Sequence, residues 1–174
     1  MAEIKKKNSA SSKNMHTVSL MVANKPGVLV RIALVFARRG FNIDSLVVSP
    51  SVNPRFSRMT ITAQGDPATL EQIVKQSAKL VDVIHSSEHT PGDAIEEELA
   101  LFKVAVKPST KAGIQKLIKK FGAHTADRTD DRMIIEIAGT TSELDAFEKL
   151  LKKYTIVEMV RSGKLVMTKG KEQT

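Results

Sequence analysis

The sequence has no cysteine and no tryptophan, and aromatic residues make up only 4% of its 174 residues. Without cysteine there is no disulfide framework, no thiolate metal site and no cysteine nucleophile. No apolar run approaches the roughly 18 residues of a membrane-spanning helix, and the N-terminal lysines are not followed by the apolar segment of a secretory signal. These absences predict a soluble cytoplasmic protein with no membrane partner.

The groups that support catalysis or bind metal are also scarce. Among the four histidines, only His85 and His89 have a metal-type spacing, and that pair falls at a predicted strand end. No phosphate-binding loop, dinucleotide fingerprint or Gly-x-Ser-x-Gly motif is present. The three glutamates at 96–98 form a run that is typical of a solvated surface. We therefore expect no catalytic residue and no metal site in this chain.

The chain is basic, with a formal net charge of +8 at pH 7. Residues 1–14 contain four lysines and one glutamate among serines and asparagines, which predicts a disordered basic leader. A small RNA-binding protein is one interpretation of this charge. RNA binding on a sheet needs exposed aromatic rings, whereas Phe36, Phe121 and Phe147 fall on apolar helix faces. We therefore expect no nucleic-acid partner.

Hydrophobic residues make up 41% of the chain, and in the first half their spacing alternates between the period of strands and that of helices. Strands are predicted at about 16–22, 42–49, 58–63 and 80–87. Two helices between them have apolar faces formed by Leu29, Ile32, Ala33 and Phe36 and by Leu70, Ile73, Val74 and Ser77. Gly40 is a typical left-handed end of the first helix. Asp66 and Pro67 are a typical N-cap and first residue of the second.

The second half repeats this order after a predicted linker at 91–97. Strands are expected at about 98–106, 123–129, 132–138, 155–161 and 164–168. The helix faces are Ile114, Leu117, Ile118 and Phe121, ending at Gly122, and Leu144, Phe147 and Leu151. Ser142 with Asp145 resembles a capping box at the start of the last helix. A shift of 74 residues aligns Gly65 with Gly139 and Leu70 with Leu144, a weak internal repeat.

The order βαββαβ occurs twice, and its natural packing is a four-stranded antiparallel sheet with both helices on one face. The predicted fold class is therefore α+β, with two tandem ferredoxin-like units. We expect a leader at 1–14, a first domain at 15–90 and a linker at 91–97. A second domain at 98–168 and a tail at 169–174 complete the chain.

The turn at 24–29, Asn-Lys-Pro-Gly-Val-Leu, is the strongest candidate binding site. A ligand can approach the backbone closely at Gly27, and the first N–H groups of the following helix suit a small carboxylate. Asn24 and Asn42 can supply amide groups, while Val28 and Leu29 can hold a short aliphatic side chain. An ordinary strand-to-helix turn has the same chemistry, so these residues alone leave both interpretations open.

Longer stretches carry a resemblance to a known family. The turn at 24–29 resembles the first loop of ACT domains, which are βαββαβ amino-acid sensors. Phe-Ala-Arg-Arg-Gly-Phe-Asn-Ile-Asp-Ser-Leu at 36–46 and Ser-Arg-Met-Thr-Ile at 57–61 resemble the small regulatory subunit of acetolactate (acetohydroxyacid) synthase. Ala-Gly-Thr at 138–140 and Val-Arg-Ser-Gly at 160–163 are similar to the C-terminal domain of that subunit. The resemblance covers about residues 15–168.

This resemblance implies a non-catalytic subunit that forms a homodimer through its ACT domains and holds valine at the interface. Such a subunit activates a catalytic large subunit and makes it sensitive to feedback inhibition in branched-chain amino acid biosynthesis. Thiamine diphosphate, Mg and FAD are then expected only in the catalytic subunit, with no cofactor in this chain. The effector-site residues implied for this sequence are Asn24, Pro26, Gly27, Val28, Leu29 and Asn42. The alternative is a free-standing amino-acid-sensing ACT protein that acts on another enzyme.

Overall fold

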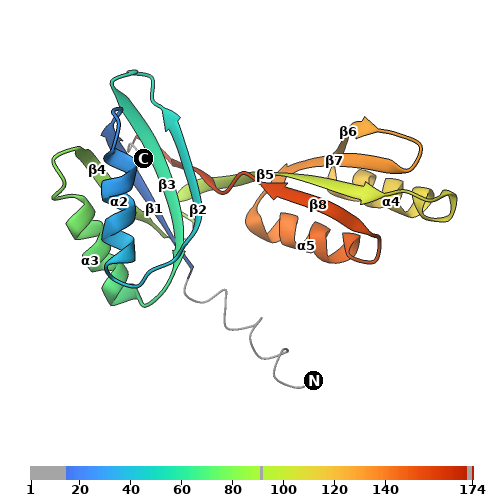
Figure 1. Ribbon diagram of the computed structural model, residues 1–174, viewed down its shortest axis with the longest axis horizontal. Coiled ribbons are helices and arrows are strands. Elements are labelled where there is room, and N and C mark those ends of the chain that lie inside the picture. The colour runs from blue at the N-terminus through green and yellow to red at the C-terminus, as the bar shows by residue number, and fades with distance from the viewer. Residues whose placement is uncertain (1–14, 91, 172–173) are drawn as a thin grey trace. The chain divides into compact units, whose positions relative to one another are not determined.

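The computed structural model describes residues 15–90, 92–171 and 174, so the predicted leader at 1–14 lies outside the described residues. Contacts divide the chain into two compact units. The first comprises the chain up to Ile95 together with Val166–Thr174, and the second is Glu96–Leu165. In each unit the helices lie on one face of an antiparallel sheet (Figure 1). The predicted α+β class with two ferredoxin-like units is confirmed.

The first unit follows the order βαββαβ. Its elements are β1 (Met15–Ala23), α2 (Val28–Ala37), β2 (Ile43–Pro50), β3 (Phe56–Gln64), α3 (Pro67–Ser77) and β4 (Val83–His89). The strand order in the sheet is β2-β3-β1-β4, and neighbouring strands are antiparallel. Strands β2 and β4 are therefore the two edges of this sheet.

The core of the first unit lies between the sheet and the helices. Val18, Leu20 and Val22 alternate along β1 and are buried, as the strand period predicts. On α2 the buried residues are Val28, Ile32 and Phe36, which are spaced by four. The prediction that Leu29 belongs to this face is wrong, because the helix begins at Val28 and Leu29 is 44% exposed.

Helix ends of the first unit follow local chemistry. Asp66 is the N-cap of α3 and accepts a hydrogen bond from the Thr69 N–H, with Pro67 as the next residue. Gly40 is left-handed, with φ 71°, shortly after the end of α2. Strand β4 begins at Val83 rather than near residue 80, because a turn closed by the Val83 N–H and the Leu80 carbonyl precedes it.

The second unit repeats the arrangement. Its elements are β5 (Ala94–Ala105), α4 (Pro108–Phe121), β6 (His124–Arg128), β7 (Arg132–Gly139), α5 (Thr141–Leu151) and β8 (Ile156–Arg161). A last strand, β9 (Leu165–Thr168), follows, and Val166–Thr168 of it group with the first unit. The sheet order is β6-β7-β5-β8, with β9 also paired to β5. Phe102, Phe121 and Phe147 pack edge to face in its core, with centroid separations of 5.5 Å and 5.3 Å.

Two local predictions for the second unit are wrong. Strand β5 begins at Ala94, so Glu96 and Glu97 lie in a strand and not in the predicted linker at 91–97. Glu98 is only 6% exposed and is not a solvated group, because Thr141 and Arg161 donate hydrogen bonds to its carboxylate. A charge is tolerated inside a protein when it is paired in this way.

The capping box of α5 is also displaced from its predicted position. Thr140, not Ser142, is the N-cap, and its side chain accepts a hydrogen bond from the Glu143 N–H. The Glu143 carboxylate in turn accepts from the Thr140 N–H at 2.8 Å. Asp145, the other predicted partner, pairs with Arg161 at 2.6 Å. The helix therefore begins two residues earlier than the Ser142–Asp145 pair predicts.

Candidate functional site

The turn between β1 and α2 has the geometry of a site for a small anion. Gly27 has φ 84°, a left-handed conformation that side chains disfavour, and it is exposed. It forms the N-cap of α2 with no side-chain cap hydrogen bond, and the first turn of the helix contains no acidic residue. The first N–H groups of α2 therefore have no side-chain hydrogen-bond acceptor, and they lie beside the exposed backbone of Gly27.

Asn24 is held in this turn by the hairpin that joins β2 and β3. Its backbone N–H donates to the Arg55 carbonyl at 2.8 Å, and its side-chain Nδ2 donates to the Pro54 carbonyl at 2.9 Å. The side-chain nitrogen therefore already has a hydrogen-bond acceptor within the chain. Because an amide oxygen is an acceptor, the Asn24 side chain suits an ammonium group better than a carboxylate.

The structure separates the roles of the remaining predicted residues of the turn. Pro26 is exposed beside Gly27. Val28 is 3% exposed and packs in the core, so only its backbone N–H can contribute to a site. Leu29 is 44% exposed and is the apolar side chain of the turn that solvent can reach.

Asn42 lies away from the turn within the chain. It precedes β2, and its Nδ2 donates to Asp44 at 3.3 Å. Between Gly27 and Asn42 lies α2, a helix of ten residues and therefore about 15 Å long. The structure brings Asn24 and Gly27 together and leaves Asn42 beyond the far end of the helix.

Asp82 is a residue of this region that sequence reasoning missed. Its carbonyl accepts from the Ala23 N–H at 2.8 Å, and its carboxylate pairs with Lys25 at 2.6 Å and with Arg31. The hydrogen bond from Lys25 and the charge of Arg31 lower the pKa of Asp82 below its ordinary value, against the effect of burial. No short motif signals this residue, since its partners are more than 50 positions away in the chain.

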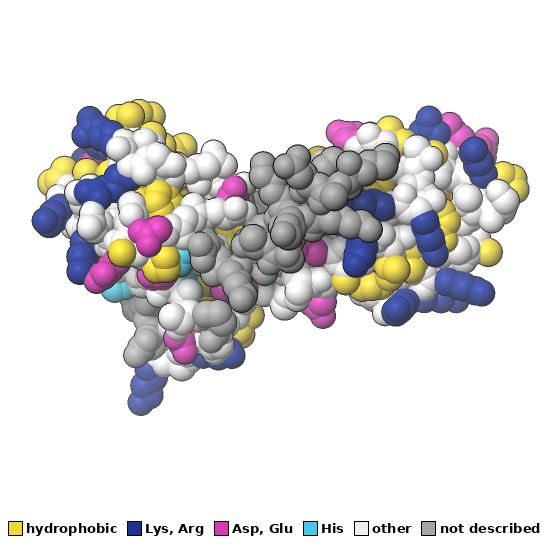
Figure 2. Space-filling view, turned by 90° about the horizontal axis from the view of Figure 1, so that it is seen from below, with side chains coloured by type: hydrophobic (Ala, Val, Ile, Leu, Met, Phe, Trp, Pro, Cys, Tyr) yellow, Lys and Arg dark blue, Asp and Glu magenta, His cyan; other side chains and the backbone are white. Residues whose placement is uncertain are grey.

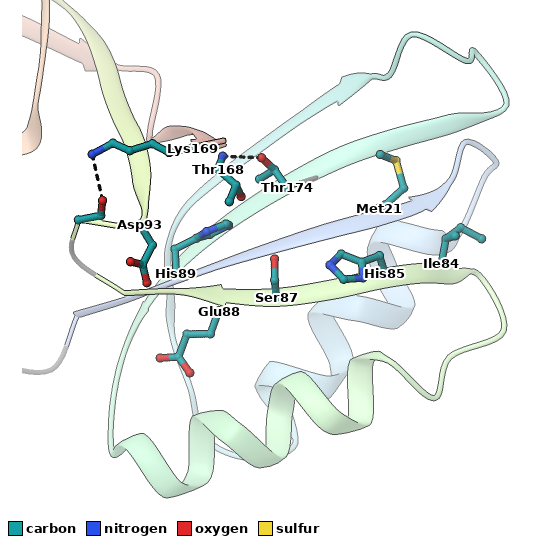
Figure 3. A pocket seen from close by; sticks show the side chains of 11 residues that line it. Met21, Ile84, His85, Ser87, Glu88, His89, Asp93, Thr168, Lys169 and Thr174 are labelled. Atoms are coloured by element: carbon teal, nitrogen blue, oxygen red, sulfur yellow. Dashed lines mark hydrogen bonds between the residues drawn. The ribbon is translucent and has the colours of Figure 1, made fainter. Parts of the chain in front are cut away.

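A separate cavity of about 920 Å³ lies in the first unit, away from the turn. His85, Ser87 and His89 of β4 extend toward the same side of the sheet, whereas Glu88 extends toward the other side (Figure 3). The His89 Nε2 and the Ser19 hydroxyl lie 2.8 Å apart. Over the described residues, no group of three or more histidine, aspartate or glutamate side chains could hold a metal ion.

The face of the second unit that is visible in Figure 2 shows no single basic patch. On the face of the second unit that Figure 2 displays, lysine and arginine side chains are scattered among hydrophobic ones. Nucleic-acid-binding domains usually gather such charge into a patch or stripe.

Within the part of the chain that the structure describes, no helix is long and apolar enough to cross a membrane.

Comparisons with known proteins match both units. Residues 18–85 match the AHAS small subunit-like ACT domain, and residues 97–170 match the family described as the small subunit of acetolactate synthase. A probable acetolactate synthase small subunit from Archaeoglobus fulgidus is 41% identical over 158 residues, covering 91% of this chain and 99% of the relative. This chain belongs to the acetolactate synthase small-subunit family.

Other members of the small-subunit family agree with this assignment. The acetolactate synthase small subunit of Mycolicibacterium smegmatis is 39% identical over 89% of this chain and 91% of the relative. A crystal structure of the acetolactate synthase small subunit from Thermotoga maritima superposes with a TM-score of 0.81 at 40% identity, covering 91% of this chain and 99% of that chain. The resemblance noted in the sequence is confirmed: the chain is the regulatory, non-catalytic subunit of an enzyme.

Proposed function

We propose that this small subunit activates a thiamine-diphosphate-dependent catalytic large subunit and makes it sensitive to valine. Feedback inhibition of branched-chain amino acid biosynthesis in the cytoplasm is the expected result. Thiamine diphosphate, Mg and FAD would then reside in the catalytic subunit, with none in this chain. The observation that carries the proposal is the left-handed, exposed Gly27 at the uncapped start of α2, in a chain of this family.

The chemistry of the turn suits a free α-amino acid. The carboxylate would bind the first N–H groups of α2, where the helix dipole also favours negative charge. The Asn24 amide oxygen would accept a hydrogen bond from the ammonium group, and Leu29 would contact the aliphatic side chain. Burial of a valine or leucine side chain contributes roughly 1.5–3 kcal/mol, so the polar contacts would supply the rest of the selectivity.

A second copy of the chain would complete this site. A bound amino acid is far shorter than α2, so Asn24 and Asn42 of one protomer cannot both contact it. Asn42 would instead be contributed by the partner protomer across a two-fold axis, where each copy offers the same surface. The edge strand β2 and the exposed apolar residues Leu29, Val30, Leu34 and Val48 support a dimer joined along this side.

A ligand between two protomers supplies what allostery requires. Its contacts change when the protomers move, so it binds one arrangement of the dimer more tightly than another. Coupling of about 1–3 kcal/mol between the valine site and the catalytic subunit is the usual magnitude.

The aromatic residues argue against a nucleic-acid ligand, because Phe36, Phe102 and Phe147 are buried and cannot stack on bases.

Two measurements test the proposal. Calorimetric titration of the purified chain with valine, leucine and isoleucine should give saturable binding of at least one of them. Silence for all three would contradict amino-acid sensing by this chain. The tagged chain should also retain an acetolactate synthase catalytic subunit during co-purification. Amino-acid binding without retention of that subunit would favour an ACT protein that regulates another enzyme.

A further inference from the structure

The proposed effector turn, residues 24–27, is held by hydrogen bonds to two neighbouring segments. One of these segments also contributes a carboxylate that the proposed binding chemistry does not use. On one side, the Asn24 backbone and side chain donate to carbonyls of the β2–β3 hairpin at 2.8 Å and 2.9 Å. On the other side, the Ala23 N–H donates to the Asp82 carbonyl at 2.8 Å. The turn therefore starts from backbone that is fixed to two neighbouring segments.

Asp82 lies immediately before β4, and its side chain is only 3% exposed. Lys25, within the turn, places its Nζ 2.6 Å from Oδ1. Arg31, in the first turns of α2, pairs with Oδ2. The two cations approach from either side of Gly27 in the chain, and their side chains are 56% and 45% exposed.

The Arg31 guanidinium also lies against the Gly27 backbone. A Cβ built on Gly27 would come within 3.1 Å of the Arg31 Nη1, and the Arg31 N–H donates to the Gly27 carbonyl at 3.2 Å. The guanidinium is therefore close enough to the exposed backbone to compete for a carboxylate bound there. Its pairing with Asp82 holds it in a fixed direction, as expected for a planar fork with a carboxylate partner.

We propose that Asp82 is a positioning residue for the effector site: it holds the turn at 24–27 in its binding conformation through Lys25 and Arg31. This rests on the proposed function, and it adds a residue outside the turn that sets effector affinity. Removing the carboxylate would free two cations and loosen the start of α2. The ligand would then have to order the turn on binding, which lowers affinity without removing any direct contact.

Asp82→Asn keeps the shape of the side chain and removes its charge. Lys25→Met removes the exposed cation that pairs with Asp82 Oδ1. Glu158→Gln is the matched control, because Glu158 forms an ion pair with Lys103 at 2.7 Å in the second unit. Valine affinity of the full chain is measured by calorimetry. Hydrogen–deuterium exchange of the backbone at 23–31 is measured without ligand, and the melting temperature is recorded for each variant.

Asp82→Asn should weaken valine binding about tenfold or more, equivalent to about 1.4 kcal/mol, and should speed exchange at 23–31. Lys25→Met should weaken binding less, by a few fold, without a large change in melting temperature. Glu158→Gln should change neither affinity nor exchange at 23–31. The inference would be overturned if both turn variants kept wild-type affinity and exchange. It would also be overturned if they differed from wild type only in a lower melting temperature.

These outcomes separate the inference from the function beneath it. If the wild-type chain binds no branched-chain amino acid, the proposed function fails, while exchange at 23–31 in Asp82→Asn still decides whether Asp82 holds the turn. If wild-type binding is saturable and the Asp82→Asn affinity is unchanged, only the positioning role fails.

Discussion

Gly27 is the residue on which the proposed effector site depends most. Its φ of 84° is reached without strain by glycine alone, and its exposed backbone lies at the start of α2. Any side chain there costs about 1–2 kcal/mol of left-handed strain and approaches the Arg31 guanidinium.

Gly27→Asp should abolish measurable valine binding, with a loss of affinity of about 100-fold or more. The added carboxylate would occupy the position of the ligand carboxylate and repel it. Gly122→Asp is the control, because Gly122 is also left-handed, at φ 64°, but has open space around it in the second unit. Calorimetry should show valine affinity lost in the first variant and kept in the second. Unchanged affinity in Gly27→Asp would mean that the ligand binds elsewhere.

Gly113, inside α4, shows how a neighbour can reverse the effect of helix propensity. Replacing an exposed helical glycine with alanine normally stabilises by up to about 1 kcal/mol. Here the new Cβ would lie 2.2 Å from the Tyr154 hydroxyl oxygen. Because the Tyr154 ring is partly buried against the core of the second unit, it cannot move away freely.

Gly113→Ala should therefore lower the free energy of unfolding by about 1–3 kcal/mol, measured by urea denaturation. In a Tyr154→Phe background the oxygen is gone and the nearest remaining atom lies at 3.2 Å. The same substitution should then be close to neutral or slightly stabilising. An equal effect in both backgrounds would contradict the contact with Tyr154.

Features of the candidate site were predictable only where the information is local. The turn chemistry of Asn24 and Gly27 is visible in six consecutive residues, and the structure gives Gly27 the left-handed backbone that such a turn needs. Asp82 has no local signature, because its partners meet it only after the sheet forms. Val28 was assigned to the ligand, yet the start of α2 turns its side chain into the core.

At the scale of elements, helix ends test how far local signals extend. Asp66 and Gly122 were predicted as an N-cap and a C-terminal stop, and both have that role. The start of α5 was predicted two residues late, since Ser142 and Asp145 have the right spacing for a capping box. The competing pair Thr140 and Glu143 has the same spacing, and periodicity alone does not choose between them.

Thr140→Ala should lower the free energy of unfolding by about 1 kcal/mol, because it removes the cap of α5. Ser142→Ala should change it by no more than about 0.5 kcal/mol. Urea denaturation of both variants at neutral pH measures the difference. A larger loss for Ser142→Ala would restore the later start of the helix.

The boundaries of β4 and β5 depend on pairing across the sheet, which the sequence does not display. Glu96 and Glu98 look solvated in the sequence, but each forms an ion pair with a later residue. Glu96 pairs with Lys164 at 2.6 Å, and Glu98 pairs with Arg161 at 2.6 Å. In the predicted linker at 91–97, Glu96 therefore lies in a strand and pairs with a partner more than 60 residues away. Such contacts explain why element types were easier to predict than their ends.

At the scale of the whole molecule, ionised carboxylates contribute to stability in both units. Hydrogen bonds from the Thr69 hydroxyl and N–H lower the pKa of Asp66, and the Thr140 N–H lowers that of Glu143. The unfolded chain therefore takes up protons at a higher pH than the folded one. This stabilisation is complete above the ordinary values of 3.8 and 4.5 and is lost as the pH falls through the lowered ones.

The free energy of unfolding should thus fall as the pH is lowered below about 4.5, the ordinary value for glutamate. Glu143→Gln keeps an oxygen acceptor for the cap but cannot titrate, so its stability should fall less steeply over the same range. Urea denaturation at a series of pH values compares the two slopes. Equal slopes would show that the cap carboxylate does not contribute to the acid sensitivity.

The two-unit chain, its shared effector site and its catalytic partner together form the proposed regulatory assembly. The most direct measurement is acetolactate formation by the catalytic large subunit as this chain, and then valine, is added. The wild-type chain should raise the rate, and valine should lower it again in a saturable way. Gly27→Asp should raise the rate equally but leave it insensitive to valine. A catalytic rate that neither the chain nor valine changes would contradict the account.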